Sequence, residues 1–357
     1  MLLAWPGLSG IVRASHLLAK LRMSRQATWA LLWLVIAALF ALAWPYRDRP
    51  AHWAAVRRTE QPLAAVRSWH YQLDHIDVAK LSEVPADLLV IDYAKHEGKK
   101  PLTREEVSVL QTGPDGRRRY VVAYLSVGES EEFRFYWDDA WKKESPDWLG
   151  EENCAWPKAR RVRYWQPGWK DINFRNPDSY LRRIIDAGFD GVYLDRIDIY
   201  ETFEKERPSA RNEMIAHVAE LARTARRLKP GFFIIPQNAE SLLAIADYRS
   251  IIDGIGKESL LHGISATGKR NTRDEIRWSL RQLSKLTGDG KPVFAVEYLL
   301  DPGHIRETAV ELKSLHIVGA FETRALDGAD PTAPVNLKTE IGTPERTAKA
   351  CPPGTSW

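Results

Sequence analysis

Short apolar segments recur along the middle of the chain. Between positions 69 and 323 there are eight runs of apolar, β-branched or aromatic residues, and several are continuous rather than alternating with polar positions. Continuous runs of this length are typical of parallel strands that are buried on both faces. The predicted strands are Trp69–Leu73, Asp87–Asp92, Tyr120–Val127, Gly191–Asp195, Phe232–Gln237, Asp253–Glu258, Val293–Tyr298 and Ile317–Thr323.

Helical patterns separate these runs. Apolar residues three and four apart between Met214 and Leu228 predict an amphipathic helix. Another helix is expected to begin at Asn176-Pro177-Asp178 and to end at Gly188, since Asn caps helices and Pro suits the first turn. Others are predicted over Arg104–Leu110, Glu240–Tyr248, Thr272–Leu286 and Gly303–Leu315. Eight strands alternating with helices predict an α/β protein, a (β/α)8 TIM barrel over residues 68–326.

A basic and then apolar segment precedes the predicted barrel. Residues 1–43 carry basic side chains and no acidic one, and they end in an apolar run from Thr28 to Ala43. That run has about 16 residues, close to the ~17–25 that span a bilayer, and it ends in small residues that suit signal peptidase. We expect either a cleaved signal peptide or an uncleaved membrane anchor, and an exported protein that is extracellular or periplasmic. A start at Met23 would give a more compact signal and is a further hypothesis.

The segments that flank the barrel lack a clear apolar period. Residues 44–67 are predicted to be a linker, and residues 327–357, rich in Pro, Gly, Thr and Ala, an irregular tail. Cys154 and Cys351 are too few for a Cys-x-x-Cys zinc site. In an exported protein they could form one disulfide, or they could remain two free thiols.

The charge balance gives no sign of a nucleic-acid partner. The net charge of +4 comes from 51 Lys and Arg against 47 Asp and Glu, and the whole surplus lies in the first 43 residues. Nucleic-acid binding needs clustered basic side chains that neutralise many phosphates. The sequence also lacks a phosphate-binding loop, a Gly-x-Ser-x-Gly elbow and a Rossmann glycine fingerprint. Contact with a membrane is expected only through an uncleaved N-terminal segment.

Acidic residues gather where the predicted strands end. In a TIM barrel the reacting groups lie at the C-terminal ends of the strands. Helix capping or pairing with Arg would explain any single acid there, but crowded carboxylates repel and raise one another's pKa, which favours a functional site. Clustered acids serve either divalent-metal binding or glycoside hydrolysis. The strand-end acids are Asp92, Glu129, Asp195, Glu258, Glu297 and Glu322.

The other residues near the strand ends favour sugar chemistry over metal chemistry. Only His70 lies on a predicted strand, so a transition-metal site is not expected, whereas Mg²⁺ or Ca²⁺ held by oxygens alone stays open. Aromatic rings suit stacking against sugars. The alternative for the Trp residues is that they pack a long loop that is otherwise poor in apolar residues. The aromatic residues are Tyr71, Tyr93, Tyr124, Tyr193 and Tyr298 near strands, and Trp137, Trp141, Trp148, Trp156, Trp165 and Trp169 between the third and fourth strands.

Several motifs at the strand ends match a known family. They are Trp69-His-Tyr-Gln-Leu73, Val90-Ile-Asp-Tyr93, Ala123-Tyr-Leu-Ser-Val-Gly-Glu129, Gly188-Phe-Asp-Gly-Val-Tyr-Leu-Asp195, Gln237-Asn238, Lys257-Glu258 and Glu297-Tyr298. The chain resembles glycoside hydrolase family 114, which includes endo-α-1,4-polygalactosaminidases. The resemblance extends over residues 69–323, and the motifs of the third and fourth strands are its most specific parts.

The resemblance implies a retaining hydrolase of α-1,4-linked, galactosamine-rich exopolysaccharide, without a cofactor. It assigns Asp195 as nucleophile and Glu258 as acid/base; Glu258 would have to be protonated near neutral pH, which burial among other acids would favour. A rim of acids would also attract the ammonium groups of deacetylated galactosamine. The residues expected to contact substrate are Tyr71, Asp92, Tyr93, Glu129, Arg196, Asn238, Glu297 and Tyr298. Two alternatives remain: a non-catalytic carbohydrate-binding barrel for polymer export or attachment, and a hydrolase with an oxygen-ligated metal.

Overall fold

The computed structural model describes residues 62–330, apart from 96–97 and 99. The predicted signal or anchor, the start at Met23, residues 44–61 of the expected linker and the tail from residue 331 lie outside the described residues. Cys154 takes part in a disulfide, and Cys351 lies outside the described part of the chain. Within residues 62–330, with the gaps just given, no helix combines the length and apolar character that crossing a bilayer requires.

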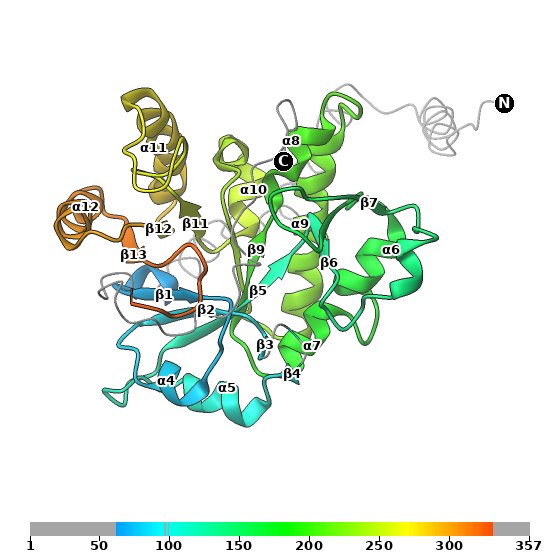
Figure 1. Cartoon of the computed structure of the whole chain (residues 1–357), viewed down its shortest axis with the longest axis horizontal. Helices are drawn as coiled ribbons and strands as arrows, with labels where there is room; N and C mark the ends of the chain where they lie inside the picture. The colour runs from blue at the N-terminus through cyan, green and yellow to red at the C-terminus, as the bar shows by residue number, and fades with distance from the viewer. Residues whose placement is uncertain (1–61, 96–97, 99, 331–357) are drawn as a thin grey trace, which may run out of the picture. The chain divides into compact units, whose positions relative to one another are not determined.

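Eight parallel strands follow one another around the fold (Figure 1). Each lies within one of the ranges predicted from the sequence. The order within the two parallel sheets, β1-β2-β5-β9-β10 and β11-β12-β13, is the order along the chain. The protein therefore has an α/β fold with the strand order of a (β/α)8 barrel. The strands are β1 (Trp69–Gln72), β2 (Leu88–Ile91), β5 (Tyr120–Ser126), β9 (Gly191–Asp195), β10 (Phe233–Pro236), β11 (Ile255–Glu258), β12 (Val293–Glu297) and β13 (Val318–Phe321).

Local contacts join the two parallel sheets. A single parallel bridge between Gln237 and Gly256 connects β10 to β11. On the other side, side chains connect β13 to β1: Trp69 Nε1 donates to the carbonyl of Val318 at 3.0 Å. Glu322 also accepts a hydrogen bond from the backbone N–H of Tyr71 at 3.2 Å. We call this second connection the β13–β1 seam.

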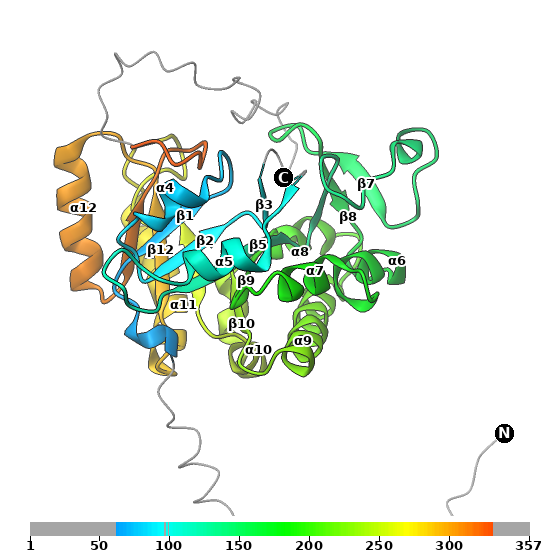
Figure 2. The same ribbon diagram turned by 90° about the horizontal axis from the view of Figure 1, so that it is seen from below.

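Helices connect the strands and lie outside them, as Figures 1 and 2 show. The helix expected from Asn176 starts later, because Asn176 has an extended backbone and Ser179 occupies the N-cap position. The predicted helix over Glu240–Tyr248 is a 3-10 turn, η5 (Glu240–Ala244), followed by α10. The α-helices between strands are α4 (Val78–Ser82), α5 (Arg104–Leu110), α6 (Pro167–Lys170), α7 (Tyr180–Asp186), α8 (Tyr200–Phe203), α9 (Ala210–Leu228), α10 (Ala246–Ile251), α11 (Arg273–Gly288) and α12 (Pro302–Ser314).

The core has two apolar layers. One lies between strands and helices, and the other consists of alternate strand residues such as Val90, Val122 and Ile235, which share a separate cluster inside the barrel. Leu63 and Val66, in and after the 3-10 turn η1 (Pro62–Ala65), are buried in the inner cluster. The last residues of the expected linker, from Pro62 onward, are therefore part of the folded domain.

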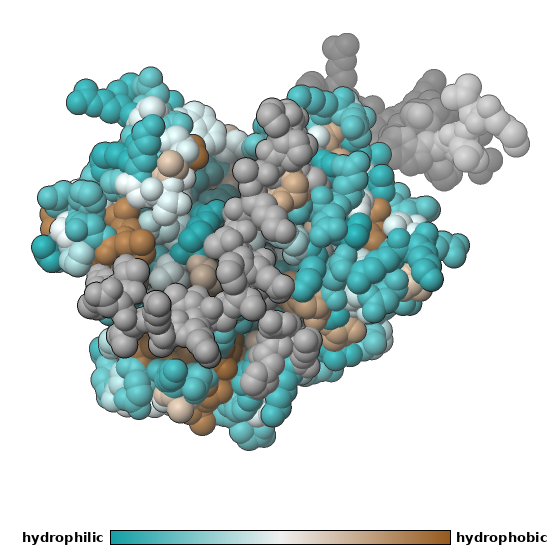
Figure 3. Space-filling view, in the orientation of Figure 1, coloured by the Kyte–Doolittle hydropathy of each residue, from teal (hydrophilic) through white to brown (hydrophobic). Residues whose placement is uncertain are grey.

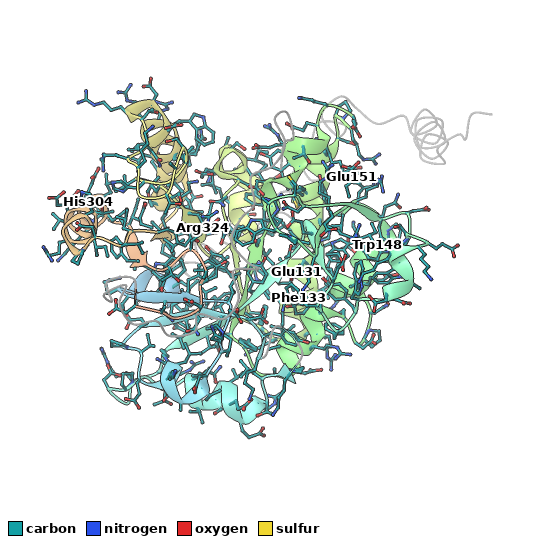
Figure 4. All side chains as sticks on the ribbon, viewed as in Figure 1. Glu131, Phe133, Trp148, Glu151, His304 and Arg324 are labelled. Carbon is teal, nitrogen blue, oxygen red and sulfur yellow. The ribbon has the colours of Figure 1, made fainter. Side chains whose placement is uncertain are left out.

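A small antiparallel sheet interrupts the βα alternation after β5. Its strands are β6 (Glu129–Glu131), β7 (Leu149–Glu152) and β8 (Ala159–Val162), in the order β6-β8-β7, and the sequence did not predict it. Trp148, labelled in Figure 4, lies at the centre of a ring cluster, with centroids 5.0 Å from Trp141 and 5.2 Å from Trp169. Most Trp residues of this segment thus pack the insertion itself, which was the alternative to sugar stacking.

Candidate active site

Two carboxyl groups meet at the C-terminal ends of the strands. Asp195 is the last residue of β9 and Glu258 the last of β11. The side-chain amide Nε2 of Gln237, which follows β10 between them, donates to Asp195 Oδ1 at 3.1 Å and to Glu258 Oε2 at 2.8 Å. Laid end to end, these two bonds limit the separation of the two oxygens to about 6 Å, which includes the ~5–5.5 Å expected of a retaining glycosidase.

Each carboxylate also has donors of its own. Asp195 accepts hydrogen bonds from the hydroxyl of Tyr124 at 2.8 Å and from the backbone N–H of Arg196 at 2.7 Å. Glu258 accepts from the hydroxyl of Tyr298, and from Asn238 Nδ2 at 3.3 Å. These donors hold both side chains in place, because hydrogen bonds to charged groups are the stronger ones in proteins.

The backbone next to the pair depends on unusual local conformations. Arg196 and Asn238 have left-handed backbone conformations, with φ of 61° and 56°. The backbone turns sharply at these two positions, which follow β9 and β10. A side chain at Gly128 would overlap the carbonyl of Arg196, and one at Gly256 would overlap the hydroxyl of Tyr193. Gly128 therefore lets the segments after β5 and β9 lie close together, and Gly256 leaves room on β11 for the ring of Tyr193.

The site raises the pKa of Asp195 to about 7. Burial is the main cause, and the negative charge of nearby Glu258 is the next, while the positive charge of Arg196 acts in the opposite direction. Burial and like charge both disfavour the ionised form of a carboxyl group. Near pH 7 about half of the free protein therefore carries a proton on Asp195.

Other strand-end acids have partners that the sequence did not reveal. Asp92 pairs with Arg134 at 2.8 Å, and both side chains are almost completely buried. Glu129 lies 3.0 Å from the guanidinium of Arg196 and accepts a hydrogen bond from Asn153. These contacts neutralise acids that we expected to face a cationic substrate. The acidic rim predicted from the sequence is therefore largely satisfied within the protein.

Two of the expected substrate contacts point away from the pair. Glu297 accepts hydrogen bonds from the backbone N–H groups of Leu261 and His262, at 2.8 and 3.1 Å, and is completely buried. Tyr93 belongs to the layer between strands and helices, with its ring centroid 4.9 Å from that of Tyr180. Glu297 ends β12 and Tyr93 lies two residues after β2, both at outward-facing positions, so neither fits a direct substrate contact.

The remaining predicted residues adjoin the pair. Tyr71 is buried inside the barrel, and its hydroxyl donates to Gln237 Oε1 at 3.2 Å. Asn238 and Tyr298 bind Glu258, and Arg196 binds Asp195 through its backbone N–H. These side chains brace the carboxyl groups. Sequence reasoning left Gln237 and Tyr124 out of the site, although both occupy inward positions at or near strand ends.

An acidic cleft of about 530 Å³ lies beside the pair. Asn238, which binds Glu258, is one of its lining residues. Trp278 and Ile264 also line it and are 41% and 51% exposed. The face of the molecule in Figure 3 is mostly hydrophilic where it is not grey. Its charged residues are five acids, Asp198, Glu201, Glu240, Asp274 and Glu275, and one base, Lys257. Two of these acids, Asp274 and Glu275, lie in the first turn of α11.

One Trp of the insertion reaches the site region. The guanidinium of Arg324, labelled in Figure 4, lies 4.8 Å from the ring centre of Tyr298 and 6.0 Å from that of Trp156. Tyr298 in turn binds Glu258. Trp156 therefore lies near Tyr298, with the guanidinium of Arg324 close to both rings. Among the residues that the structure describes, no three His, Cys, Asp or Glu side chains are grouped as metal ligands.

The fold and the site define the class of protein. Two carboxyls within reach of each other at the C-terminal ends of parallel strands are the arrangement of a glycoside hydrolase. The sequence matches glycoside-hydrolase family GH114 over residues 49–334, and the chain belongs to this family.

The chain is also similar to two uncharacterised relatives and shares its fold with a solved structure. An uncharacterised protein of Thermotoga maritima is 34% identical over 278 residues, 76% of this chain and 80% of the relative. One from Deinococcus radiodurans is 35% identical over 269 residues, 74% of this chain and 83% of the relative. The glycoside hydrolase domain of PelA from Pseudomonas aeruginosa has the same fold, with a TM-score of 0.57 and 22% identity over 74% of this chain and 97% of that domain.

Proposed function

We propose that this glycoside hydrolase is a retaining enzyme that cleaves α-1,4-linked, galactosamine-rich exopolysaccharide. The observation that carries the mechanism is the amide of Gln237, which contacts Asp195 and Glu258 at once. An inverting enzyme separates its carboxyls by ~6.5–9.5 Å to admit a water molecule, whereas a retaining enzyme keeps them ~5–5.5 Å apart. A non-catalytic barrel would have no need to hold two acids at this spacing.

In the proposed reaction Asp195 is the nucleophile, and Glu258 is first the general acid and then the general base. Asp195 attacks the anomeric carbon while Glu258 gives its proton to the leaving oxygen, and a glycosyl-enzyme ester forms. Glu258 then takes a proton from water, which attacks the same carbon and releases Asp195. Asp195 must be ionised to attack, and a cationic sugar bound nearby favours its ionised form. Because the pKa of Asp195 is raised to about 7, kcat/KM is expected to rise with pH up to about 7.

The acidic cleft supports the choice of substrate. Its five acids exceed its single Lys, so a polymer that carries free ammonium groups would be attracted and a neutral one would not. The cleft replaces the strand-end rim as the proposed source of this attraction. An extracellular or periplasmic location, suggested by the N-terminal pattern, would bring the enzyme to such a polymer.

The test is hydrolysis of defined polymers by the full chain. We expect reducing ends from deacetylated galactosaminan, fewer from its N-acetylated form, and none from chitosan. Asp195→Asn and Glu258→Gln should each lower the rate by about 10³-fold or more while leaving the circular dichroism spectrum unchanged. Asp115→Asn, in an exposed turn, is the matched control. Full activity in both site variants would contradict the proposal.

Azide can assign the two roles separately. In Asp195→Ala, azide can enter the space left by the nucleophile and attack from its side of the sugar, so the product is the β-glycosyl azide. In Glu258→Ala, azide attacks the glycosyl-enzyme ester and the product is the α-glycosyl azide. The anomer is read by proton NMR. The opposite pairing of anomers would reverse the roles of Asp195 and Glu258.

A further inference from the structure

The side-chain nitrogen of Gln237 uses both of its hydrogens to donate to the carboxyl pair. The nitrogen of a Gln side chain carries two hydrogens, and here one points to Asp195 and the other to Glu258. Its oxygen accepts from the hydroxyl of Tyr71 at 3.2 Å. This pattern fixes which end of the amide faces the carboxyls, because both of those partners accept and Tyr71 donates. Within the described residues, no other side chain donates to both carboxyls.

The surroundings hold Gln237 rigidly. It is 3% exposed, its backbone N–H donates to the carbonyl of Leu194 at 2.8 Å, and it forms the bridge from β10 to β11. Tyr71 is fixed as well, since its ring packs 5.2 Å from that of Tyr193 and its backbone N–H donates to Glu322. A chain of buried contacts therefore runs from the β13–β1 seam through Tyr71 and Gln237 to the carboxyl pair.

We propose that Gln237 is the positioning residue that sets the separation of the two carboxyl groups, and that Tyr71 acts through it. The inference rests on the proposed function, because a fixed separation matters only if Asp195 and Glu258 react with one substrate. Gln237 does not touch the reacting atoms of the sugar in this mechanism. It keeps two groups of like charge close together by donating a hydrogen bond to each, which offsets part of their repulsion.

Removing the amide should also change how the pair ionises. Both of its hydrogen bonds favour the ionised forms, so their loss makes the charged states less stable. The titratable and charged groups that face one or both carboxyl groups come from four strands and from the segments after β9 and β12. They are Tyr71 on β1, Tyr124 on β5, Tyr193 on β9, Arg196 and Asp198 after β9, Glu258 at the end of β11 and Tyr298 after β12.

The first experiment compares Gln237→Leu with wild type on the cleaved polymer. Leu has a similar size and no donor, so we expect kcat about 10–100-fold lower with KM changed less than about twofold. The acidic limb of the pH profile should move to higher pH by about one unit. Tyr71→Phe removes only the contact to the amide oxygen. It should lower kcat and move the acidic limb to higher pH, each by less than Gln237→Leu does. Unchanged kcat and an unchanged pH profile in Gln237→Leu would overturn the inference.

A second experiment needs no substrate. With ¹³C-labelled Asp carboxyls, the Asp195 signal is assigned by its absence in Asp195→Asn, and its titration is followed by NMR in wild type and in Gln237→Leu. We expect the pKa of Asp195 to rise in the variant; an unchanged pKa overturns the inference even if the enzyme cleaves galactosaminan. If wild type cleaves no polymer, the proposed function fails while this titration still tests the pair. Should Gln237→Leu not fold, Tyr71→Phe gives the same readout.

Discussion

Asp92 and Arg134 form an ion pair whose side chains are 5% and 1% exposed. The guanidinium of Arg134 also contacts Glu131 at 2.6 Å and lies 4.8 Å from the ring centre of Phe133; Figure 4 labels Glu131 and Phe133. A buried charge needs such partners, because water no longer solvates it. Asp92 therefore stabilises the loop after β5 and is enclosed in it, although its position at a strand end resembles that of Asp195.

This burial predicts what Asp92→Asn will do. Removing one charge of a buried pair is destabilising, here by about 2–4 kcal/mol because Glu131 remains, so we expect Tm to fall by about 5–10 °C. KM for the polymer should be unchanged. Calorimetry and kinetics test this, with Asp274→Asn in the cleft as a control that should raise KM without lowering Tm. A raised KM at unchanged Tm in Asp92→Asn would restore Asp92 as a substrate contact.

Elements of secondary structure meet at the β13–β1 seam through side chains. His70 Nδ1 lies 2.9 Å from Glu322, and its other ring nitrogen, Nε2, contacts Gln72 at 3.1 Å. Burial lowers the pKa of His70, but the hydrogen bond and charge of Glu322 outweigh it, so the pKa is raised. A raised pKa in the folded state means that the protonated form stabilises the fold.

The seam should therefore weaken as pH rises. The contribution of His70 is fully present below its unfolded pKa of about 6.5 and is lost as pH rises through the higher folded value. We expect the Tm of wild type to exceed that of His70→Gln at pH 6, and this difference to narrow by about 2–4 °C at pH 8.5. Thermal unfolding at the two pH values measures it. A difference that grows with pH would mean that neutral His70 is the stabilising form.

The same elements explain what the sequence could predict. All eight strands were predictable from short apolar, β-branched or aromatic runs, several of which are continuous. The strand ends indicated six candidate acids, and the family resemblance selected Asp195 and Glu258 among them. The partners of the other acids were not, since Arg134 lies 42 residues from Asp92, and the backbone that binds Glu297 lies 36 residues away. The insertion after β5 was missed because its strands are short and contain charged residues, so they lack the continuous apolar pattern.

At the scale of the whole molecule, the acidic and basic side chains of α11 line two different surface cavities. Asp274 and Glu275 in its first turn line the acidic cleft. Arg273, Arg277 and Arg281 line a separate groove of about 500 Å³, together with Arg270. The net charge of +4 therefore does not describe the field that a polymer meets at the site. The electrostatic potential in the cleft beside the carboxyl pair depends on the charged residues of α11 that line it, which are Asp274 and Glu275.

This sorting predicts how activity responds to salt. Salt screens exposed charges over a Debye length of about 8 Å at physiological ionic strength, so kcat/KM for deacetylated galactosaminan should fall about tenfold between 50 and 500 mM NaCl. The double variant Asp274→Asn, Glu275→Gln should flatten this dependence; Gln at the second position can preserve the capping box with Thr272. Arg273→Gln, which changes a residue of the separate groove, is the matched control and should leave the slope unchanged. An equal salt dependence in wild type and the double variant would show that the cleft does not attract the polymer.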